Sequence, residues 1–274
     1  MELVQDTHRL ALMNMLLHGI GSEKSVPVRV GDALGADPGE RFEVVLANPP
    51  FGKKSSTVIV GEDGRTSTEK DTIERDDFWA TTSNKQLNFV QHIKTLLAIH
   101  GRAAVVLPDN VLFEGGAGET IRKKLLHECD LHTLLRLPTG LFYAQGVKAN
   151  VLFFDRKPAQ EKPWTQKLWI YDLRTNMHFT LKENPLKRES LEDFVACYHA
   201  KNRHDRQESE RFKSFDYADL IKRDKINLDI FWLKDDALEE SANLPAPGVI
   251  ALDIMEDLQA ALEQFATIAE DLKL

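Results

Sequence analysis

The sequence predicts an α/β protein whose sheet contains parallel strands, with a helical extension at its C-terminal end. Short apolar runs, typical of strands covered on both faces, alternate with segments whose apolar residues recur every three or four positions, as in packed helices. Residues 201–211 are too polar to pack and predict a linker. We therefore expect a sheet-containing domain at 1–200, then a linker and C-terminal helical region at 201–274.

The N-terminal part of the chain predicts one helix, two strands and a long loop. Apolar residues at helical spacing over 6–18, followed by Gly19, indicate an opening helix. Val26–Val30 is a β-branched run and Phe42–Ala47 is nearly all apolar, so both are expected to be buried parallel strands. The polar stretch 52–85 far exceeds the roughly 4 to 6 residues of ordinary connections, and such a loop is usually functional or mobile.

The rest of the sheet-containing domain predicts further helices and strands in alternation. Helices are expected at Lys85–Ile99, Glu119–Glu128 and 190–200, and strands at Arg102–Leu107, Leu131–Leu137, Asn150–Phe154 and Leu168–Leu173. The short spacing between the second and third of these strands suggests an antiparallel pair at a sheet edge. Residues 138–146 would form the turn of that pair.

The C-terminal stretch Val249–Leu274 predicts a helix with one apolar stripe. Its apolar residues alternate steps of three and four, while acidic residues occupy the other faces. The stripe is too short for an independent coiled coil, which needs roughly 3 heptads or more. A helix packed on its own domain and a helix that docks on a partner chain are equally consistent with it.

Composition predicts a soluble, cytoplasmic protein. The two cysteines, Cys129 and Cys197, lie far apart in no CxxC or Cys/His pattern, which argues against a disulfide framework or a zinc site. No apolar run approaches the roughly 20 residues needed to cross a bilayer, and the N-terminal residues lack the pattern of a signal peptide.

The formal net charge of -8 argues against binding nucleic acid by bulk electrostatics, because neutralising phosphates requires clustered Lys and Arg. Local basic clusters do occur at Lys53-Lys54, at Arg122-Lys123-Lys124 and within 201–211. Such runs are more often solvated faces than binding sites. Any contact with nucleic acid is therefore expected to be local or shared with a partner.

The tetrapeptide Asn48-Pro49-Pro50-Phe51 has the groups needed to activate an amine attached to an aromatic ring. The lone pair of such an amine is delocalised into the ring, so the nitrogen is a poor nucleophile. The Asn48 side-chain oxygen and the Pro49 carbonyl can accept its two hydrogens and localise the lone pair, with proline fixing the backbone. The Phe51 ring can stack on a base swung out of its helix, a contact worth about 1 to 3 kcal/mol in other systems.

The position of this tetrapeptide favours that interpretation over the alternative, a rigid turn after a strand. It follows an apolar strand at the end where open α/β sheets bind their ligands, and the long polar loop after it could cover a substrate. Gly31-Asp32-Ala33-Leu34 stands at the end of the preceding predicted strand. There, Asp32 could accept a hydrogen bond from the adenine amine of a cofactor.

Five segments of the chain resemble, in the same order, the modification subunit of Type I restriction-modification systems. They are Glu2-Leu3-Val4 with the following ALMNMLLHGI, GDAL at 31–34, LANPPFG at 46–52, GRAAVVLPDNVLFEGG at 101–116 and GVKANVLFFDR at 146–156. The family consists of adenine-N6 DNA methyltransferases that use S-adenosylmethionine. The resemblance runs through most of the chain, and five ordered matches are far more specific than one.

The resemblance implies a fold, two sites and a set of partners. The fold is the Rossmann-like mixed sheet of S-adenosylmethionine-dependent methyltransferases, and the reaction is direct methyl transfer to a flipped adenine without a metal. The implied cofactor residues are Glu2, as the ribose-binding acid, with Asp32, Ala33 and Asn48, and the implied catalytic residues are Asn48, Pro49, Pro50 and Phe51. The implied partners are DNA, a sequence-reading specificity subunit, a second modification subunit and a restriction subunit, with no membrane.

One part of the family pattern does not match. The glycine-rich cofactor loop that ends the family's first strand should lie upstream of Glu2, and the glycines at 115–118 belong to a later segment. The helical domain that precedes the catalytic domain is not matched either. We therefore expect an incomplete sheet with a gap beside the strand that ends at Asn48, and a chain that is inactive until the N-terminal segment is supplied separately.

Two other functions remain open from the sequence. A non-catalytic fragment could use the C-terminal helix to dock on a specificity subunit. Alternatively, the same tetrapeptide could serve methylation of RNA bases or of a protein glutamine amide. The acidic charge and the lack of a recognisable RNA-binding module in the sequence disfavour the RNA alternative.

Overall fold

A computed structural model describes most of the chain as two compact units, Met1–Trp232 and Leu233–Leu274. The residues described are 1–22, 25–51, 56–60, 66–70, 72–142, 146–199, 201–235 and Met255, with 56–60 and 66–70 described as backbone. The predicted apolar stripe at 249–274 lies outside them, apart from the exposed Met255. Among the helices in the described ranges, none has both the length and the apolarity to cross a membrane.

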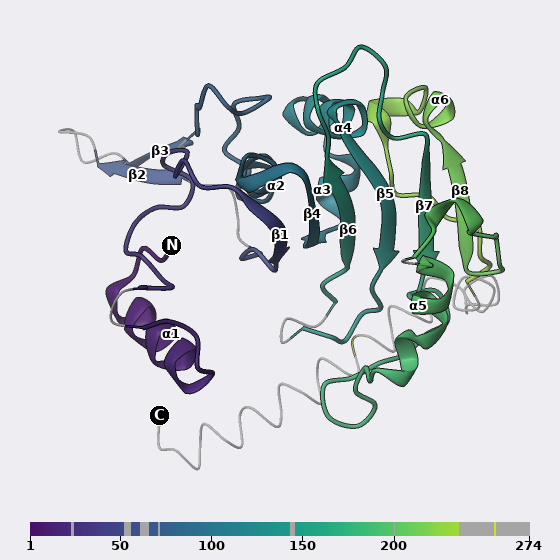
Figure 1. Ribbon diagram of the computed structural model, residues 1–274, viewed down its shortest axis with the longest axis horizontal. Coiled ribbons are helices and arrows are strands. Elements are labelled where there is room, and N and C mark those ends of the chain that lie inside the picture. The colour runs from purple at the N-terminus through teal and green to yellow at the C-terminus, as the bar shows by residue number, and fades with distance from the viewer. Residues whose placement is uncertain are drawn as a thin grey trace. The chain divides into compact units, whose positions relative to one another are not determined.

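The first unit is built on a six-stranded mixed sheet, which confirms the predicted fold class (Figure 1). In order across the sheet, its strands are β1 (Phe42–Ala47), β4 (Leu97–Pro108), β6 (Ala149–Arg156), β5 (Cys129–Arg136), β7 (Lys167–Asp172) and β8 (Phe212–Asp216). The β1·β4 and β5·β7 pairs are parallel and the other pairs are antiparallel. Strands β1, β4, β5 and β7 therefore run in one direction, and their carboxyl ends share one edge, called here the carboxyl edge.

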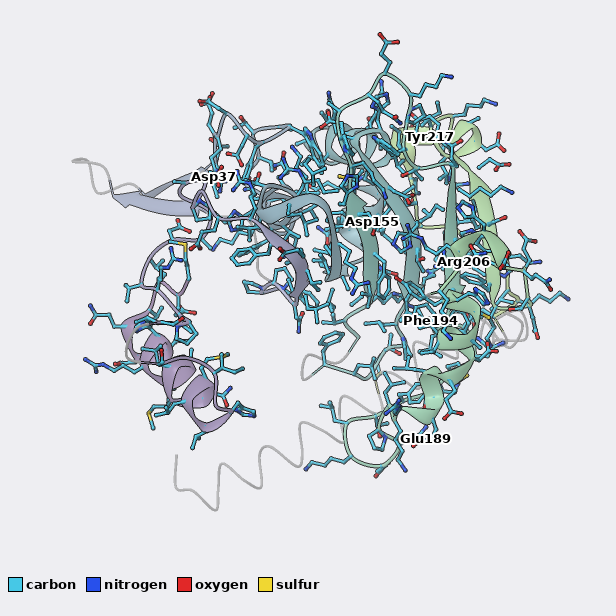
Figure 2. All side chains as sticks on the ribbon, viewed as in Figure 1. Asp37, Asp155, Glu189, Phe194, Arg206 and Tyr217 are labelled. Atoms are coloured by element: carbon cyan, nitrogen blue, oxygen red, sulfur yellow. The ribbon has the colours of Figure 1, made fainter. Side chains whose placement is uncertain are left out.

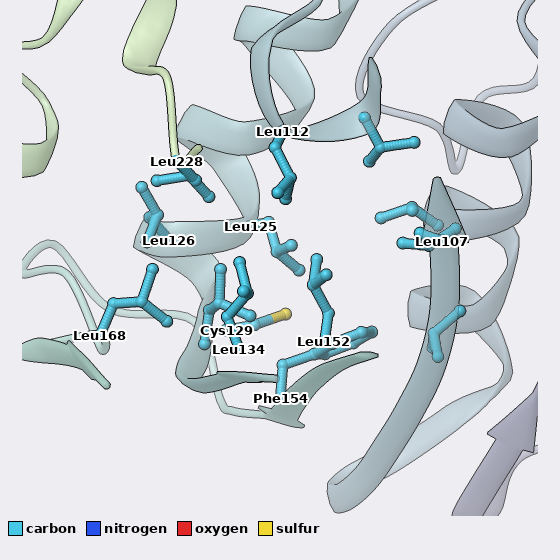
Figure 3. Packing of buried hydrophobic residues seen from close by; sticks show 14 of the residues in the cluster. Leu107, Leu112, Leu125, Leu126, Cys129, Leu134, Leu152, Phe154, Leu168 and Leu228 are labelled. Carbon is cyan, nitrogen blue, oxygen red and sulfur yellow. The ribbon is translucent and has the colours of Figure 1, made fainter. Parts of the chain in front are cut away.

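Two apolar clusters lie on opposite faces of this sheet, as the alternation of side chains along its strands requires. The first contains Leu134 and Ile170 and is covered by α2 (Lys85–Leu96), α3 (Asn110–Phe113) and α4 (Ala117–Glu128) (Figure 3). The second contains their neighbours Leu135 and Tyr171, with Phe194 from α5 (Glu192–Tyr198). The predicted helices at 85–99, 119–128 and 190–200 are thus present, with shifted ends.

Short elements complete the first unit. These are the 3-10 helices η1 (Glu189–Leu191), η2 (Arg203–Asp205) and η3 (Asp224–Ile226), and the four-residue helix α6 (Tyr217–Leu220). Ile226 and Leu220 belong to the first cluster, so the chain returns to the α4 side of the sheet after β8. None of these short elements was predicted.

The N-terminal prediction is confirmed for the helix and wrong for the first strand. Helix α1 (Gln5–Leu17) forms as expected, but it buries no residue, and Leu17 is 83% exposed. Within the predicted strand Val26–Val30, Val30 alone forms a β-bridge, which is parallel and joins it to Glu2. Pro27 has no backbone N–H to donate to a ladder, which explains why the β-branched run does not become a strand.

The predicted burial of Phe42–Ala47 on both faces is wrong. The segment is a strand, β1, but it lies at an edge of the described sheet with β4 as its one neighbour. Phe42, Val44 and Leu46 are therefore exposed, and Leu46 reaches 78%. An exposed apolar edge of this kind is a template for pairing with another strand.

The long segment after β1 is not simply a loop. It contains a two-stranded antiparallel sheet formed by β2 (Ser56–Val60) and β3 (Thr66–Lys70). An isolated bridge then joins Ile73 to Thr82, and Trp79 packs against the first apolar cluster. Polar composition concealed this structure because a small hairpin buries little apolar surface.

The antiparallel pairing of the strands at 131–137 and 150–154 is confirmed, but their placement at a sheet edge is wrong. Strand β6 lies between β4 and β5, and β7 pairs with the other side of β5. The strand predicted at 168–173 forms as β7, and the unpredicted β8 becomes the true edge.

The prediction that 201–211 is too polar to pack is also wrong. The compact unit extends past residue 200 to Trp232, and Arg206 in this segment is 7% exposed. Its guanidinium donates to the carbonyls of Tyr198 and His132 and lies over the Tyr198 ring. Partners of this kind compensate the burial of a charged side chain.

The interior position of Leu107 in β4 predicts a large cost for shortening it. Leu107 is 1% exposed, so Leu107→Ala should lower the free energy of unfolding by about 2 to 5 kcal/mol. The matched control is Leu46→Ala at the exposed edge, which should change it by no more than about 0.5 kcal/mol. Urea unfolding measures both values, and equal costs would contradict the burial described for β1 and β4.

Candidate active site at the carboxyl edge

The Asn48-Pro49-Pro50-Phe51 segment leaves the sheet at the carboxyl end of β1. Pro49 is buried, whereas Asn48 and Pro50 are exposed. The half-buried Phe51 ring meets the Phe142 ring edge to face, with centroids 5.2 Å apart and an interplanar angle of 61°. The buried proline and the supported ring anchor the backbone, and the Asn48 amide is presented to solvent.

Phe142 is a site residue that the sequence reasoning missed, because it lies in the segment predicted as a turn. Two residues before it, Gly140 has a φ of +84°, and a Cβ built there would lie 2.0 Å from the Phe179 carbonyl oxygen. A side chain at this position is excluded by both the conformation and the space. The sequence signal available for a specifically shaped loop was a glycine two positions before an aromatic residue, within a short connection between two strands.

An ion pair between Arg174 and Asp109 joins the ends of several strands at the same edge. Arg174 donates to both carboxylate oxygens of Asp109, at 2.7 and 2.8 Å, in a bidentate arrangement. It also donates to the carbonyls of Leu137 and Ala149, both at 2.8 Å. Asp109 follows β4, Leu137 follows β5, Ala149 begins β6 and Arg174 follows β7.

The protonation state of Asp109 agrees with this arrangement. Burial on its own would raise the pKa of the carboxyl, but the hydrogen bonds and charge of Arg174 outweigh that effect and lower it. The Asn150 side chain adds a further hydrogen bond to Asp109 at 2.7 Å. The carboxylate is therefore ionised and fully engaged in holding the edge together.

The predicted cofactor residues Glu2 and Asp32 are brought close together by the backbone. The Glu2 N–H donates to the Arg29 carbonyl at 2.8 Å, and the Gly31 N–H donates to the Glu2 carbonyl at 3.0 Å. The exposed Asp32 carboxylate accepts the Leu34 N–H at 2.8 Å, and Ala33 between them is half-buried.

No hydrogen bond among the described residues joins this pair of segments to Asn48. The catalytic and cofactor predictions therefore occupy two groups in the structure, each internally connected.

Arg75 connects the Asp32 segment to the helix beside β1. Its side chain is 5% exposed and donates to the Leu34 carbonyl at 3.3 Å and to Nδ1 of His92, in α2, at 3.2 Å. A bidentate pair with Asp77, at 2.9 and 2.8 Å, compensates its charge. Sequence reasoning placed Arg75 in a polar loop, and no periodic pattern marked it as buried.

His92 is neutral in this arrangement. Burial, followed by the charge of Arg75, lowers the pKa of His92 to about 4. The neutral ring can accept the Arg75 hydrogen through Nδ1, which the protonated ring could not do.

Comparison with known proteins places these features in a family. The family model described as N-6 DNA Methylase matches residues 1–237, which include the whole sheet, Glu2, Asp32 and the Asn48 segment. The chain belongs to the N-6 DNA methylase family. The resemblance noted from five sequence segments is thereby confirmed.

The chain is similar to methylase subunits of Type I restriction enzymes. It is 40% identical to the StySJI methylase subunit of Salmonella typhimurium and to the EcoKI methylase subunit of Escherichia coli, in each case over 99% of this chain and 55% of the relative. The crystal structure of the EcoKI M protein matches with a TM-score of 0.72 and 37% identity, over 100% of this chain and 59% of that one. The chain thus spans about half the length of these relatives.

The lowered pKa of His92 predicts a pH-dependent stability. As the pH falls below the ordinary value of 6.5, the unfolded chain takes up a proton at His92 before the folded chain does. The free energy of unfolding should therefore fall by about 2 kcal/mol between pH 7 and pH 5 from this residue alone. His92→Gln keeps an acceptor for Arg75 and should remove that part of the loss. Urea unfolding at both pH values measures it, and an unchanged pH dependence would refute the assignment.

The ion pair of Arg174 and Asp109 predicts that losing the arginine alone lowers the free energy of unfolding more than removing both charges. Arg174→Met leaves a partly buried carboxylate without its partner and should cost about 3 to 5 kcal/mol of unfolding free energy. The double variant Asp109→Asn with Arg174→Met should recover part of that loss, because the unpaired charge is gone. Arg9→Met, at a side chain 71% exposed, is the control for the substitution itself. Equal unfolding midpoints for the Arg174 and Arg9 variants would exclude the proposed role of the pair.

Proposed function

We propose that this chain carries the target-base site of a DNA adenine-N6 methyltransferase and acts in the modification subunit of a Type I restriction-modification system. The observation that carries the proposal is the exposed Asn48 amide at the carboxyl end of β1, next to the buried Pro49 and the paired rings of Phe51 and Phe142. Membership of the N-6 DNA methylase family and the similarity to methylase subunits of Type I restriction enzymes support the same activity.

The chemistry follows from how this segment would hold an adenine amine. The Asn48 side-chain oxygen and the Pro49 carbonyl would accept the two amine hydrogens, so that the nitrogen lone pair is directed out of the ring. A flipped adenine would lie against Phe51, whose ring is held in place by Phe142. The nitrogen would then bond to a methyl group, the bond from methyl carbon to its sulfur would break, and one amine proton would be released to solvent. Pro50 would fix the backbone between the acceptors and the ring.

The methyl donor would be S-adenosylmethionine, which supplies an electrophilic methyl group on sulfur. The residues at 2 and 31–34 fit such a group, because two carboxylates stand on segments held together by backbone hydrogen bonds. The Glu2 carboxylate would accept hydrogen bonds from the ribose hydroxyls, and the Asp32 carboxylate would accept one from the adenine amine. The small Ala33 side chain would leave room beside them. Asn48 would complete the site on the side of the target base.

DNA and a sequence-reading specificity subunit are the partners that we propose. The net charge of -8 leaves little general attraction to phosphate, so a partner that contributes DNA contacts fits the composition. A solved structure with 26% identity and a TM-score of 0.63 comes from the complex assembly of a Type I restriction-modification system. We propose the C-terminal region after residue 232 as the element that docks on the specificity subunit. A second modification subunit and the restriction subunit are the further proposed partners.

The test is a methylation assay on the chain assembled with its partner subunits and with a segment that carries the family's glycine-rich cofactor loop. With a tritiated methyl donor and duplex DNA, Asn48→Ala should lower methyl incorporation by about 100-fold or more, because it removes an acceptor used in the transition state. Nucleoside analysis of the product should yield N6-methyladenine. Retained incorporation by Asn48→Ala would refute the assignment of the base site.

The control for this test is Asn14→Ala, at an exposed asparagine of α1. It should leave incorporation unchanged. Asn48 is exposed, so Asn48→Ala should also leave the urea midpoint and the assembly of the complex unchanged.

A further inference from the structure

A cavity of about 750 Å³ lies on the α5 face of the sheet, outside the candidate active site. Its walls include residues from the start of β5, the start of β7 and the segment around η2, such as His132, Trp169, Arg203 and Arg206. Ligand pockets in proteins are typically about 300 to 1,000 Å³ in volume. The cavity is therefore large enough for a nucleotide.

This cavity is at the edge of the sheet opposite to Asn48. Residues 130 and 132 are near the amino end of β5 and residues 167 and 169 begin β7, whereas Asn48 follows the carboxyl end of β1. Strands β1, β5 and β7 run in the same direction. A ligand bound here would thus leave the candidate active site free.

The residues that line the cavity carry more positive than negative charge in a chain that is acidic overall. The lining carries four cationic side chains, Lys157, Lys167, Arg203 and Arg206, against two carboxylates, Asp130 and Glu208. Asp155 and Asp216, outside the lining, form ion pairs with all of these cations except Arg206. Arg203 and Arg206 belong to the basic run at 201–211 that the sequence singled out.

Arg203 is held in one position by two carboxylates. It donates to Asp155 at 2.7 Å and to Asp130 at 3.2 Å, and Lys157 lies 3.4 Å from the same Asp155 oxygen. Figure 2 labels Asp155 and Arg206, which come from the last residues of β6 and from the segment after η2. Cations fixed in this way lose little side-chain entropy when an anion binds.

Arg206 is the group that points to an anion. The residue is 7% exposed, and its Nε and Nη1 donate to the carbonyls of Tyr198 and His132. Its Nη2 is buried and has no hydrogen-bond partner among the described residues. A buried, unpaired guanidinium N–H costs free energy that an anionic acceptor would recover. No carboxylate of the described part of the chain forms an ion pair with Arg206.

Two tryptophans give the cavity flat apolar walls beside these cations. The Trp169 ring is stacked on Phe212, with centroids 4.8 Å apart and planes at 24°. The Trp164 indole N–H donates to the Pro158 carbonyl at 2.8 Å, which fixes the orientation of that ring. Aromatic rings next to phosphate-binding cations are the combination that binds nucleotides by stacking and charge.

We propose that this cavity is a second ligand site, and that it binds a nucleoside phosphate with the phosphate on Arg206 and Arg203 and the base against Trp169 or Trp164. The ligand is either a free mononucleotide or a nucleotide unit of single-stranded DNA, since both present the same phosphate and base. The site does not depend on the catalytic role of Asn48.

The first test compares probes on the intact chain by calorimetry. dAMP should bind, and deoxyadenosine, which lacks the phosphate, should bind at least about 10-fold more weakly, as expected for loss of charge-assisted hydrogen bonds. If a short single-stranded oligo-dA binds more tightly than dAMP, the site is assigned to DNA. If the two have the same dissociation constant, counted per nucleotide, the site is assigned to a free nucleotide. No binding of dAMP at millimolar concentration, or equal affinity for deoxyadenosine, would overturn the proposal.

The second test locates the site with variants. Arg206→Gln should weaken dAMP binding about 10-fold or more, and Lys167→Gln, at an exposed wall residue, should weaken it about 3-fold without affecting the fold. Lys162→Gln, exposed and outside the cavity lining, is the matched control and should leave binding unchanged.

dTMP, whose base has no exocyclic amine for Asn48 and Pro49 to hold, should bind within about 3-fold of dAMP because stacking tolerates any base, which separates this proposal from the proposed methyl transfer. If Arg206→Gln fails to fold, Trp169→Phe together with Lys167→Gln provides the second measurement. Binding that is insensitive to all variants of the cavity, or binding of dAMP without binding of dTMP, would overturn the proposal.

Discussion

The carboxyl edge of the sheet depends on the ion pair of Arg174 and Asp109. The two residues are 65 positions apart in sequence and lie beyond the ends of β7 and β4, which are not neighbours in the sheet. Desolvating two charges is costly, and the bidentate geometry and the carbonyls of Leu137 and Ala149 offset that cost. The pair consequently links the ends of β7 and β4 directly, whereas backbone hydrogen bonds link each of these strand ends to its neighbours in the sheet. The loop that carries Phe142 follows Leu137 directly.

That constraint adds to the support that the two prolines give to the Asn48 tetrapeptide. The Asn48 segment follows a strand with a single neighbour, so its own ladder gives little support. Support comes instead from Phe142 on one side and, through α2, from the network of Arg75 and His92. The exposed side chains of β1 remain the least stabilised part of this arrangement. The contacts that support the Asn48 segment therefore come from the loop after β5 and from α2, and not from the open edge of β1.

The local sequence pattern was sufficient to predict those helices and strands that depend on residues close in sequence. The helix at 85–96 and the strand at 167–172 follow from spacing and residue type within a short window, and the proposed chemistry of Asn48 is inferred from a window of the same kind. Position in the sheet did not follow, because β8 and its long-range pairing decide which strands are internal. The roles of Arg75 and Phe142 were missed for the same reason, since each acts through a partner far along the chain. The strand predicted at Val26–Val30 was wrong because the β-branched residues were given more weight than Pro27, which was a local signal against a strand.

Polarity in this sequence was a poor guide to exposure, and arginine is the cause. Arg122 and Arg136 are nearly fully buried, and both donate to backbone carbonyls of the segment that follows β8. A guanidinium has five donors in a fixed plane, so it can satisfy several carbonyls at irregular chain ends where a ladder cannot reach. Arg206 follows the same rule with two of its nitrogens and departs from it with the third. Arg136 also has buried nitrogens without a hydrogen-bond partner, but its Nη2 lies 3.0 Å from the Asp229 carboxylate, whereas Arg206 has no ion-pair partner among the described residues and lines a cavity. An unused donor in that setting favours a ligand over a structural role.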